Sequence, residues 1–168
     1  INGTVNIAAG GTHTAGSNGT GTALDAATQT ITNTLTYADG ATVAWDLISN
    51  ASSNNPGATN QFDQFNLSTG SGDLAFGTSL NFDIDFGSSV DFNDAFWNAN
   101  LQEWLVWDTG DTEVIPTNYT ITNSFNSAWN SDQSGGVFQL QAGSAYGGSA
   151  NGVWLVQTSA IPEPSTFS

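Results

Sequence analysis

The chain has 168 residues and a formal net charge of −15 at pH 7, because its 15 acidic side chains face no Lys, no Arg and a single His. A nucleic-acid-binding protein needs cationic side chains to replace the counterions of the phosphates, so this class is excluded. The absence of Cys also excludes a disulfide framework, a thiolate nucleophile and a zinc knuckle.

The aromatic content separates this acidic chain from disordered acidic segments. Six Trp, ten Phe and three Tyr make up 11% of the residues, and such side chains supply large buried areas. The rest is dominated by Gly, Ser, Thr and Asn, which favour turns and short strands over helices. We therefore expect one all-β domain over residues 1–159, large enough to bury a real core.

In chain order, residues 1–26 are rich in Gly, Thr and Asn, and they form either a flexible arm, an exchanged strand or an early strand with loops. Residues 28–37 alternate well and predict a strand. Residues 38–40 predict a turn, and the alternation of Val43, Trp45 and Leu47 predicts a second strand.

The middle of the chain is the most regular part. Leu80, Phe82, Ile84 and Phe86 alternate with polar residues, which predicts a half-buried strand. A short helical turn is expected after Asp91. Further strands are expected at residues 104–107, 119–121, 137–140 and 153–156.

These strands recur without a helix long enough for a βαβ crossover, so two architectures fit. A parallel β-solenoid (β-helix) is favoured, because few hairpin-type Asn-Gly or Asp-Gly pairs stand between the alternating segments. The alternative is an antiparallel β-sandwich or jelly roll.

The sequence offers little for catalysis. Any Ser-His-Asp triad would depend on His13, which lies in a loop-like segment and is expected to be a surface residue. Glu103 and Glu113 are the only Glu residues away from the C-terminal end, and nothing in their spacing places them roughly 5 to 10 Å apart as a glycosidase requires. We therefore expect a protein that is not an enzyme.

Two kinds of ligand remain open. Asp108, Asp111 and Glu113 present three acids in six residues, which suits Ca²⁺ as a cofactor, although a solvated acidic surface explains them as well. A carbohydrate-binding site would use exposed aromatic rings, although core packing also explains such residues. The candidates for stacking on sugars are Trp97, Trp104, Trp107 and Trp129.

The last residues, 160–168, read Ala-Ile-Pro-Glu-Pro-Ser-Thr-Phe-Ser and resemble the PEP-CTERM sorting signal. The motif residues are Pro162, Glu163 and Pro164; the apolar span and Arg cluster that follow them in that family are absent, which we interpret as maturation or truncation. The resemblance implies export to the outer cell surface of a Gram-negative bacterium. A start at Ile1 without Met agrees with a removed leader.

A second resemblance covers residues 38–108. The segments ADGATVAWDL, NQFDQFNLSTGSGDLAFGTSLNFDIDF and VDFNDAFWNANLQEWLVWD are similar to autotransporter-associated β-strand repeats. That family implies a parallel β-helix displayed outside the cell and implies no catalytic residues. No run of 18 apolar residues is present, so the sequence predicts no membrane span.

Together these observations predict an extracellular structural protein that assembles head to tail into a filament or biofilm matrix. The alternative is a lectin-like module associated with an exopolysaccharide. An N-terminal strand could add to a sheet edge of the next copy through backbone hydrogen bonds. The residues of this strand are Gly3, Thr4, Val5, Asn6, Ile7 and Ala8.

Overall fold

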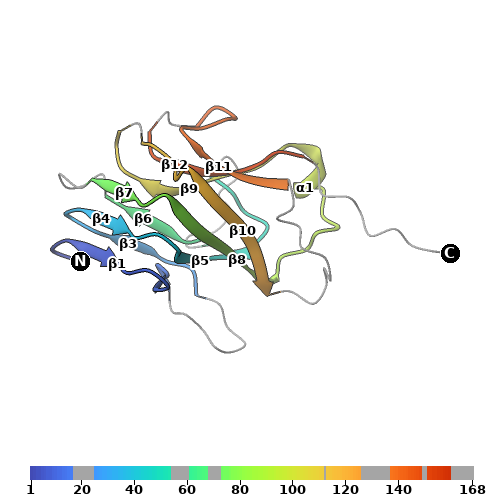
Figure 1. Cartoon of the computed structure of the whole chain (residues 1–168). Helices are drawn as coiled ribbons and strands as arrows, with labels where there is room; N and C mark the ends of the chain where they lie inside the picture. The colour runs from blue at the N-terminus through green and yellow to red at the C-terminus, as the bar shows by residue number, and fades with distance from the viewer. Residues whose placement is uncertain are drawn as a thin grey trace.

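Figure 1 shows the computed structural model, which describes residues 1–16, 25–53, 61–67, 73–111, 113–125, 137–148 and 151–159. These residues form twelve strands and one short helix. The prediction of an all-β protein is therefore confirmed. Within the described residues, no helix has the length and apolar composition needed to cross a membrane.

The strands form three sheets. The first sheet has the order β1-β4-β7, with β1 at Val5–Ile7, β4 at Leu35–Tyr37 and β7 at Leu74–Phe76. The second has the order β10-β8-β5-β2, with β10 at Asn118–Phe125, β8 at Ser79–Ser89, β5 at Ala41–Ser49 and β2 at Thr12–His13. The third has the order β11-β12-β9-β6-β3, with β11 at Phe138–Ala142, β12 at Val153–Gln157, β9 at Glu103–Asp108, β6 at Gln64–Asn66 and β3 at Thr28–Thr30.

Most neighbouring strands run in the same direction. Of the nine strand pairings among the described residues, seven are parallel. The two antiparallel pairings join β12 to β9 and to β11 near the C-terminal end. The antiparallel sandwich or jelly roll is therefore not the arrangement of these strands.

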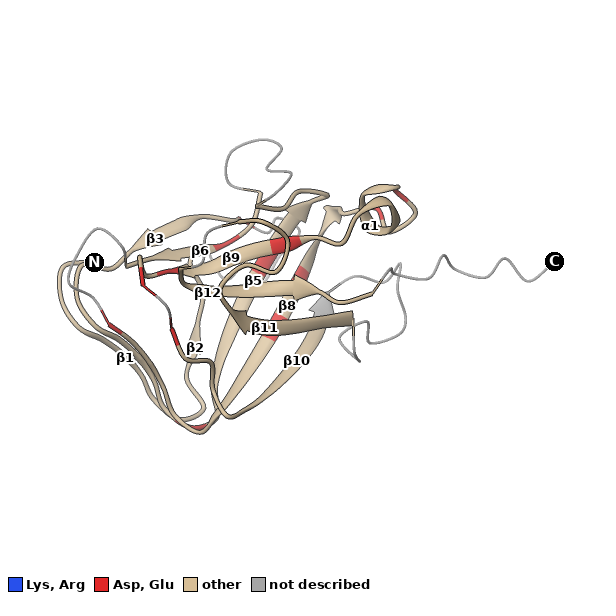
Figure 2. Cartoon of the chain, turned by 90° about the horizontal axis from the view of Figure 1, so that it is seen from above, with Lys and Arg blue, Asp and Glu red and all other residues tan. Residues whose placement is uncertain are grey.

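The chain visits the three sheets in the same order three times, through β1-β2-β3, β4-β5-β6 and β7-β8-β9. Residues in equivalent places stack in register, as Thr12, Thr42, Asn81 and Thr120 do across the second sheet. Figure 2 looks down the stack of strands, so the sheets are seen as the sides of a three-cornered outline.

The corners explain where the sequence prediction differs from the structure. Residues 28–37, expected as one strand, are divided into β3 and β4. Between them the Asn33 carboxamide oxygen accepts the backbone N–H of Thr34 at 2.9 Å, a local bond that competes with an extended ladder. The turn predicted at residues 38–40 is present, and Gly40 adopts a φ of 73° that favours Gly.

The core lies between the three sheets and is filled by the inward sides of their strands. The alternating residues predicted to share one face of β5 and β8 are buried, as expected. Aromatic rings form a continuous cluster there, including Tyr37, Trp45, Phe65, Phe82, Phe86, Trp104 and Trp107. The predicted helical turn is α1, Phe96–Ala99, which contributes Phe96 and Trp97 to the core.

The predicted N-terminal assembly strand, residues 3–8, lies in the chain's own first sheet. Its central part is β1, which pairs in parallel with β4 and packs Val5 and Ile7 against the core. The outer edge of β1 has no neighbouring strand in the described part of the chain. Exchange of this strand between copies stays a prediction.

Candidate functional site

The tryptophans proposed to stack on sugars lie inside the molecule. The side chains of Trp97, Trp104 and Trp107 are fully buried. The indole N–H of Trp104 donates to the carbonyl of Ala51 at 2.6 Å, as expected for a buried ring with a polar atom. For these three residues the carbohydrate prediction is wrong, because stacking on a sugar requires an exposed ring. Trp129 lies outside the described residues.

Two of the three acids proposed to bind calcium, Asp111 and Glu113, interact electrostatically. Within the part of the chain that the structure describes, no group of three or more His, Asp or Glu side chains is placed to hold a metal ion. Partial burial, together with the negative charges of Asp111 and Asp73, raises the pKa of Glu113. Ca²⁺ needs several oxygen ligands around one point, so the described residues give no support to a calcium site at Asp108, Asp111 and Glu113, and this site stays a prediction.

His13 is buried at the end of β2, so the expectation of a surface residue is also wrong. Its Nε2 lies 2.8 Å from the Gln29 side-chain oxygen, and its Nδ1 lies 2.7 Å from the Tyr37 hydroxyl. The Tyr37 oxygen accepts the indole N–H of Trp107 at 3.2 Å. The His13 ring lies 4.5 Å from that of Phe65, measured between centroids.

These contacts fix the direction of every bond in the network. The Gln29 oxygen is an acceptor, so Nε2 carries the proton, and Nδ1 accepts the proton of Tyr37. Burial lowers the pKa of His13, and the bond to Gln29 only partly opposes this effect. His13 is therefore a neutral structural residue that joins the first and third sheets to β2.

Asp46 and Asp63 form a buried acidic pair where β5 approaches the segment before β6. The Asp63 carboxylate accepts the backbone N–H groups of Ala27 at 2.9 Å and Asp46 at 3.3 Å, and the hydroxyl of Thr14 at 3.2 Å. Asp46 Oδ2 is buried and has no hydrogen-bond partner. Asp63 thus ties three segments together, whereas Asp46 contributes a carboxyl that is poorly solvated.

Burial and crowding change the acidity of this pair. Burial, then the charges of Asp63 and Asp85, raises the pKa of Asp46 to about 7. Burial also raises the pKa of Asp63 to about 6, although four hydrogen-bond donors, those of Ala27, Asp46, Thr14 and Gly16, oppose the effect. No basic side chain is available to balance either charge, because the chain has no Lys or Arg.

Glu103 is buried at the start of β9, where its carboxylate orders the loop between β11 and β12. The carboxylate accepts the Ser144 hydroxyl at 2.7 Å and the backbone N–H groups of Ala145 at 2.9 Å, Tyr146 at 3.0 Å and Gly148 at 3.2 Å. Four donors surround one carboxylate, so Glu103 serves the fold and is not presented to a substrate.

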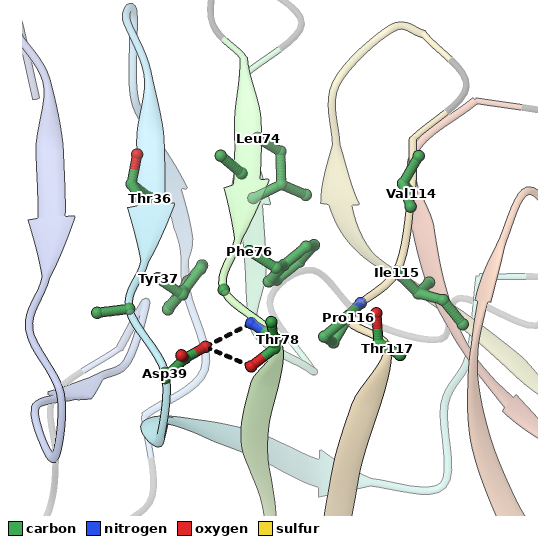
Figure 3. Close-up of a pocket in the computed structure, with 13 residues that line it drawn as sticks. Thr36, Tyr37, Asp39, Leu74, Phe76, Thr78, Val114, Ile115, Pro116 and Thr117 are labelled. Atoms are coloured by element: carbon green, nitrogen blue, oxygen red, sulfur yellow. Dashed lines mark hydrogen bonds between the residues drawn. The ribbon is translucent and has the colours of Figure 1, made fainter.

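An open cleft of about 630 Å³ lies between β7 and residues 114–117 (Figure 3). Leu74, Phe76 and Ile115 supply its apolar surface. Asp39 and Thr78 supply polar groups at one end. The volume falls within the roughly 300–1,000 Å³ typical of ligand pockets, so this cleft is the candidate binding site.

Asp39 is held in a fixed orientation at the end of the cleft. Its Oδ1 accepts the Thr78 hydroxyl at 3.0 Å, the backbone N–H of Thr78 and the backbone N–H of Ser79 at 3.3 Å. These bonds, those of Thr78 first, lower the pKa of Asp39. Asp39 is therefore an exposed, ionised carboxylate at neutral pH, although the sequence marked it only as part of a turn.

Comparison with protein-family models, with curated proteins and with solved structures finds no match. The cleft and the sheet edges are therefore interpreted from their own geometry. The residues of the proposed sorting motif, Pro162, Glu163 and Pro164, lie outside the described part of the chain.

Proposed function

We propose that the chain is a short, three-sided parallel β-solenoid that serves as a non-enzymatic structural protein on the outer surface of a Gram-negative bacterium. Copies assemble head to tail into a filament or surface matrix. The repeated order of the three sheets and the stacked parallel strands support the solenoid. The resemblance of the C-terminal residues to a sorting signal supports the location.

One observation carries the assembly proposal, namely that both ends of the stack finish in uncharged strand edges. Strands β1, β2 and β3 end the three sheets on one side, and β10 and β11 end two of them on the other. None of these five strands contains an acidic residue, although the chain carries 15 acids. Backbone edges of two copies can therefore approach without bringing carboxylates together.

Strand direction is compatible with a head-to-tail contact. Strand β10 runs parallel to β8, β5 and β2. Strand β11 is antiparallel to β12, which is antiparallel to β9, so β11 runs in the same direction as β9, β6 and β3. A second copy in the same orientation would thus present parallel edges. Such a heterologous contact propagates into a filament unless its rotation closes a ring.

The eight-residue β10 edge offers the longest ladder for this contact. The first, second and third sheets hold three, four and five described strands, so at the C-terminal end each sheet extends one strand beyond the one before it. Exposed edges are commonly blocked by Lys, and this chain has none. We expect β10 to pair with β2 of the next copy, because these two strands form the opposite edges of the second sheet.

The test compares Lys substitutions at two residues that are paired in register on neighbouring strands of the second sheet. Thr120→Lys places a charged side chain on the β10 edge, whereas Asn81→Lys makes the same addition on β8, inside the sheet. Sedimentation velocity and negative-stain electron microscopy at about 150 mM salt should show polymers of the parent protein. Thr120→Lys should raise the concentration needed for assembly by about tenfold, and Asn81→Lys should change it little.

Deletion of residues 1–9 supplies a second variant, which removes β1 from the opposite end of the stack, and it should also weaken assembly. A parent protein that stays monomeric at high concentration would refute the assembly proposal. Equal effects of the two Lys variants would instead show that added charge, and not the β10 edge, controls the association.

A further inference from the structure

Strand β7 ends the first sheet early. The second sheet continues from β8 to β10, and the third continues from β9 to β12, whereas β7 pairs only with β4 among the described strands. Residues 113–117 run beside β7 but form no strand with it. The chain rejoins a ladder only at Asn118, whose backbone N–H donates to the carbonyl of Thr78 at 3.0 Å. The cleft occupies this interruption of the sheet.

The backbone of β7 presents hydrogen-bonding groups to the cleft that pair with none of the described residues. On the β4 side, the carbonyl of Asp73 accepts the N–H of Leu35 at 2.9 Å, and the N–H of Gly77 donates to the carbonyl of Tyr37 at 2.8 Å. Because alternate residues of a strand point their backbone groups to opposite sides, those of Leu74 and Phe76 face the cleft.

No hydrogen bond between the described residues joins Leu74 or Phe76 to residues 113–117. Two N–H groups and two carbonyls therefore line this side of the cleft at the spacing of a β-ladder. Such groups need a partner, which is either water or another strand. An extended peptide that enters the cleft would satisfy them by strand addition.

Acidic residues lie at both ends of this edge. Asp39 lies at the end that Thr78 and Thr117 line. Asp73 directly precedes Leu74, and Glu113 directly precedes Val114, so these two flank the opposite end. Asp73 and Asp111 both act electrostatically on Glu113, which indicates that the three acids are close. No Lys or Arg of the chain opposes them.

We propose that the cleft binds an extended peptide segment of another protein as an added strand beside β7. The segment carries Lys or Arg on both sides of a short uncharged stretch. Its backbone pairs with Leu74 and Phe76, its inward side chains contact Phe76 and Ile115, and its cations face Asp39 at one end and Asp73 and Glu113 at the other. A second copy of this chain fits poorly, because it has no Lys or Arg to offer.

The probe is a labelled nine-residue peptide with two Lys at each end and alternating Thr and Val between them. Fluorescence anisotropy is measured with the protein at a concentration where sedimentation shows monomers. We expect saturable binding that weakens as salt rises. A peptide with Glu in place of Lys should not bind. A peptide with N-methyl groups on alternate backbone amides, which blocks one ladder edge, should bind at least tenfold more weakly.

Two variants test the acidic ends, and a third serves as a control. Asp39→Asn and Glu113→Gln should each weaken binding about three- to tenfold, whereas Asp83→Asn, on β8 of the second sheet, should have little effect. Glu113→Gln keeps the test valid if Asp39→Asn disturbs the turn. Circular dichroism verifies that each variant is folded.

Several results would overturn the proposal. Equal binding of the N-methylated peptide would show that charge alone attracts the probe. Loss of peptide binding at protein concentrations where sedimentation shows self-association would identify a second copy as the occupant, and displacement by a neutral oligosaccharide would identify a carbohydrate. Because the assay uses monomers, its failure would leave the assembly proposal intact, and failure of assembly would leave peptide binding intact.

Discussion

Asp46 and Asp63 bind each other through reciprocal contacts: the backbone N–H of Asp63 donates to the carbonyl of Asp46 at 3.0 Å, and the backbone N–H of Asp46 donates to the Asp63 carboxylate at 3.3 Å. This arrangement brings two carboxyl groups together in the interior of a chain that has no basic side chain besides His13. Protonation is the means of neutralising the pair within the molecule, so its stability depends on pH.

We predict that the pair makes the protein more stable at pH 4 to 5 than at pH 7.5. A pKa of about 7 for Asp46, against 3.8 normally, means that the folded protein binds protons more tightly than the unfolded chain between these values. Protonated Asp46 therefore stabilises the folded protein at low pH, and this stability is lost as the pH rises toward 7. Asp46→Asn should therefore raise the melting temperature at pH 7.5 by about 3 °C or more and change it little at pH 4.5.

The control for this prediction is Asp111→Asn, which removes the same charge from an exposed position. At pH 7.5, Asp111→Asn should raise the melting temperature less than Asp46→Asn does. His13 acts in the opposite direction, because its lowered pKa favours the unfolded chain in acid, so each variant is compared with the parent protein at the same pH. An equal gain from both Asp variants would attribute the effect to net charge alone.

We predict that Glu103→Gln destabilises the fold by about 2 to 4 kcal/mol. The amide that replaces one carboxylate oxygen would direct a donor at other donors, and a charge-assisted set of hydrogen bonds would be lost. Glu113→Gln is the matched control and should be neutral or slightly stabilising, because it relieves repulsion from Asp111 and Asp73. Urea unfolding followed by circular dichroism measures both, and equal effects would contradict a special role for Glu103.

The sequence predicted the strands well because alternation of side chains is a local property. The alternation of Leu80, Phe82, Ile84 and Phe86 with polar residues predicts a buried face whatever strands lie beside it, and all four side chains are buried in the structure. The parallel pairing was also anticipated, because few hairpin-type Asn-Gly or Asp-Gly pairs stand between the alternating segments. Aromatic residues were harder to assign, because burial of Trp104 and Trp107 depends on which strand lies opposite.

The candidate site depends on contacts between successive passages of the chain, which a local pattern does not contain. Asp39 contacts Thr78, and Asp83 contacts Thr122, each across 39 residues. The sequence carries a signal for this spacing, because the alternating apolar residues that begin at Leu35 recur from Leu74 onward. The cleft itself has no such signal, since it arises where a strand fails to form.

We predict that Trp107→Ala lowers stability by about 3 to 5 kcal/mol. Its ring is fully buried against Phe65, Phe76 and Phe82, so truncation leaves a large cavity. Trp107→Phe should recover most of the loss. Thermal melts of the two variants measure this, and a folded Trp107→Ala protein with an unchanged melting temperature would contradict the assignment to the core.

The last prediction concerns the protonation of His13, which can be observed directly because the chain contains one His. The Gln29 oxygen and the Tyr37 hydroxyl require the neutral ring to carry its proton on Nε2. Nitrogen-15 NMR of the imidazole should show this tautomer, with titration only below pH 6.5 because burial lowers the pKa. In Tyr37→Phe the partner of Nδ1 is absent, so the preference for one tautomer should weaken and the protein should lose about 1 to 3 kcal/mol of stability. A ring protonated on Nδ1, or one that titrates at or above pH 6.5, would mean that His13 is not enclosed by this network.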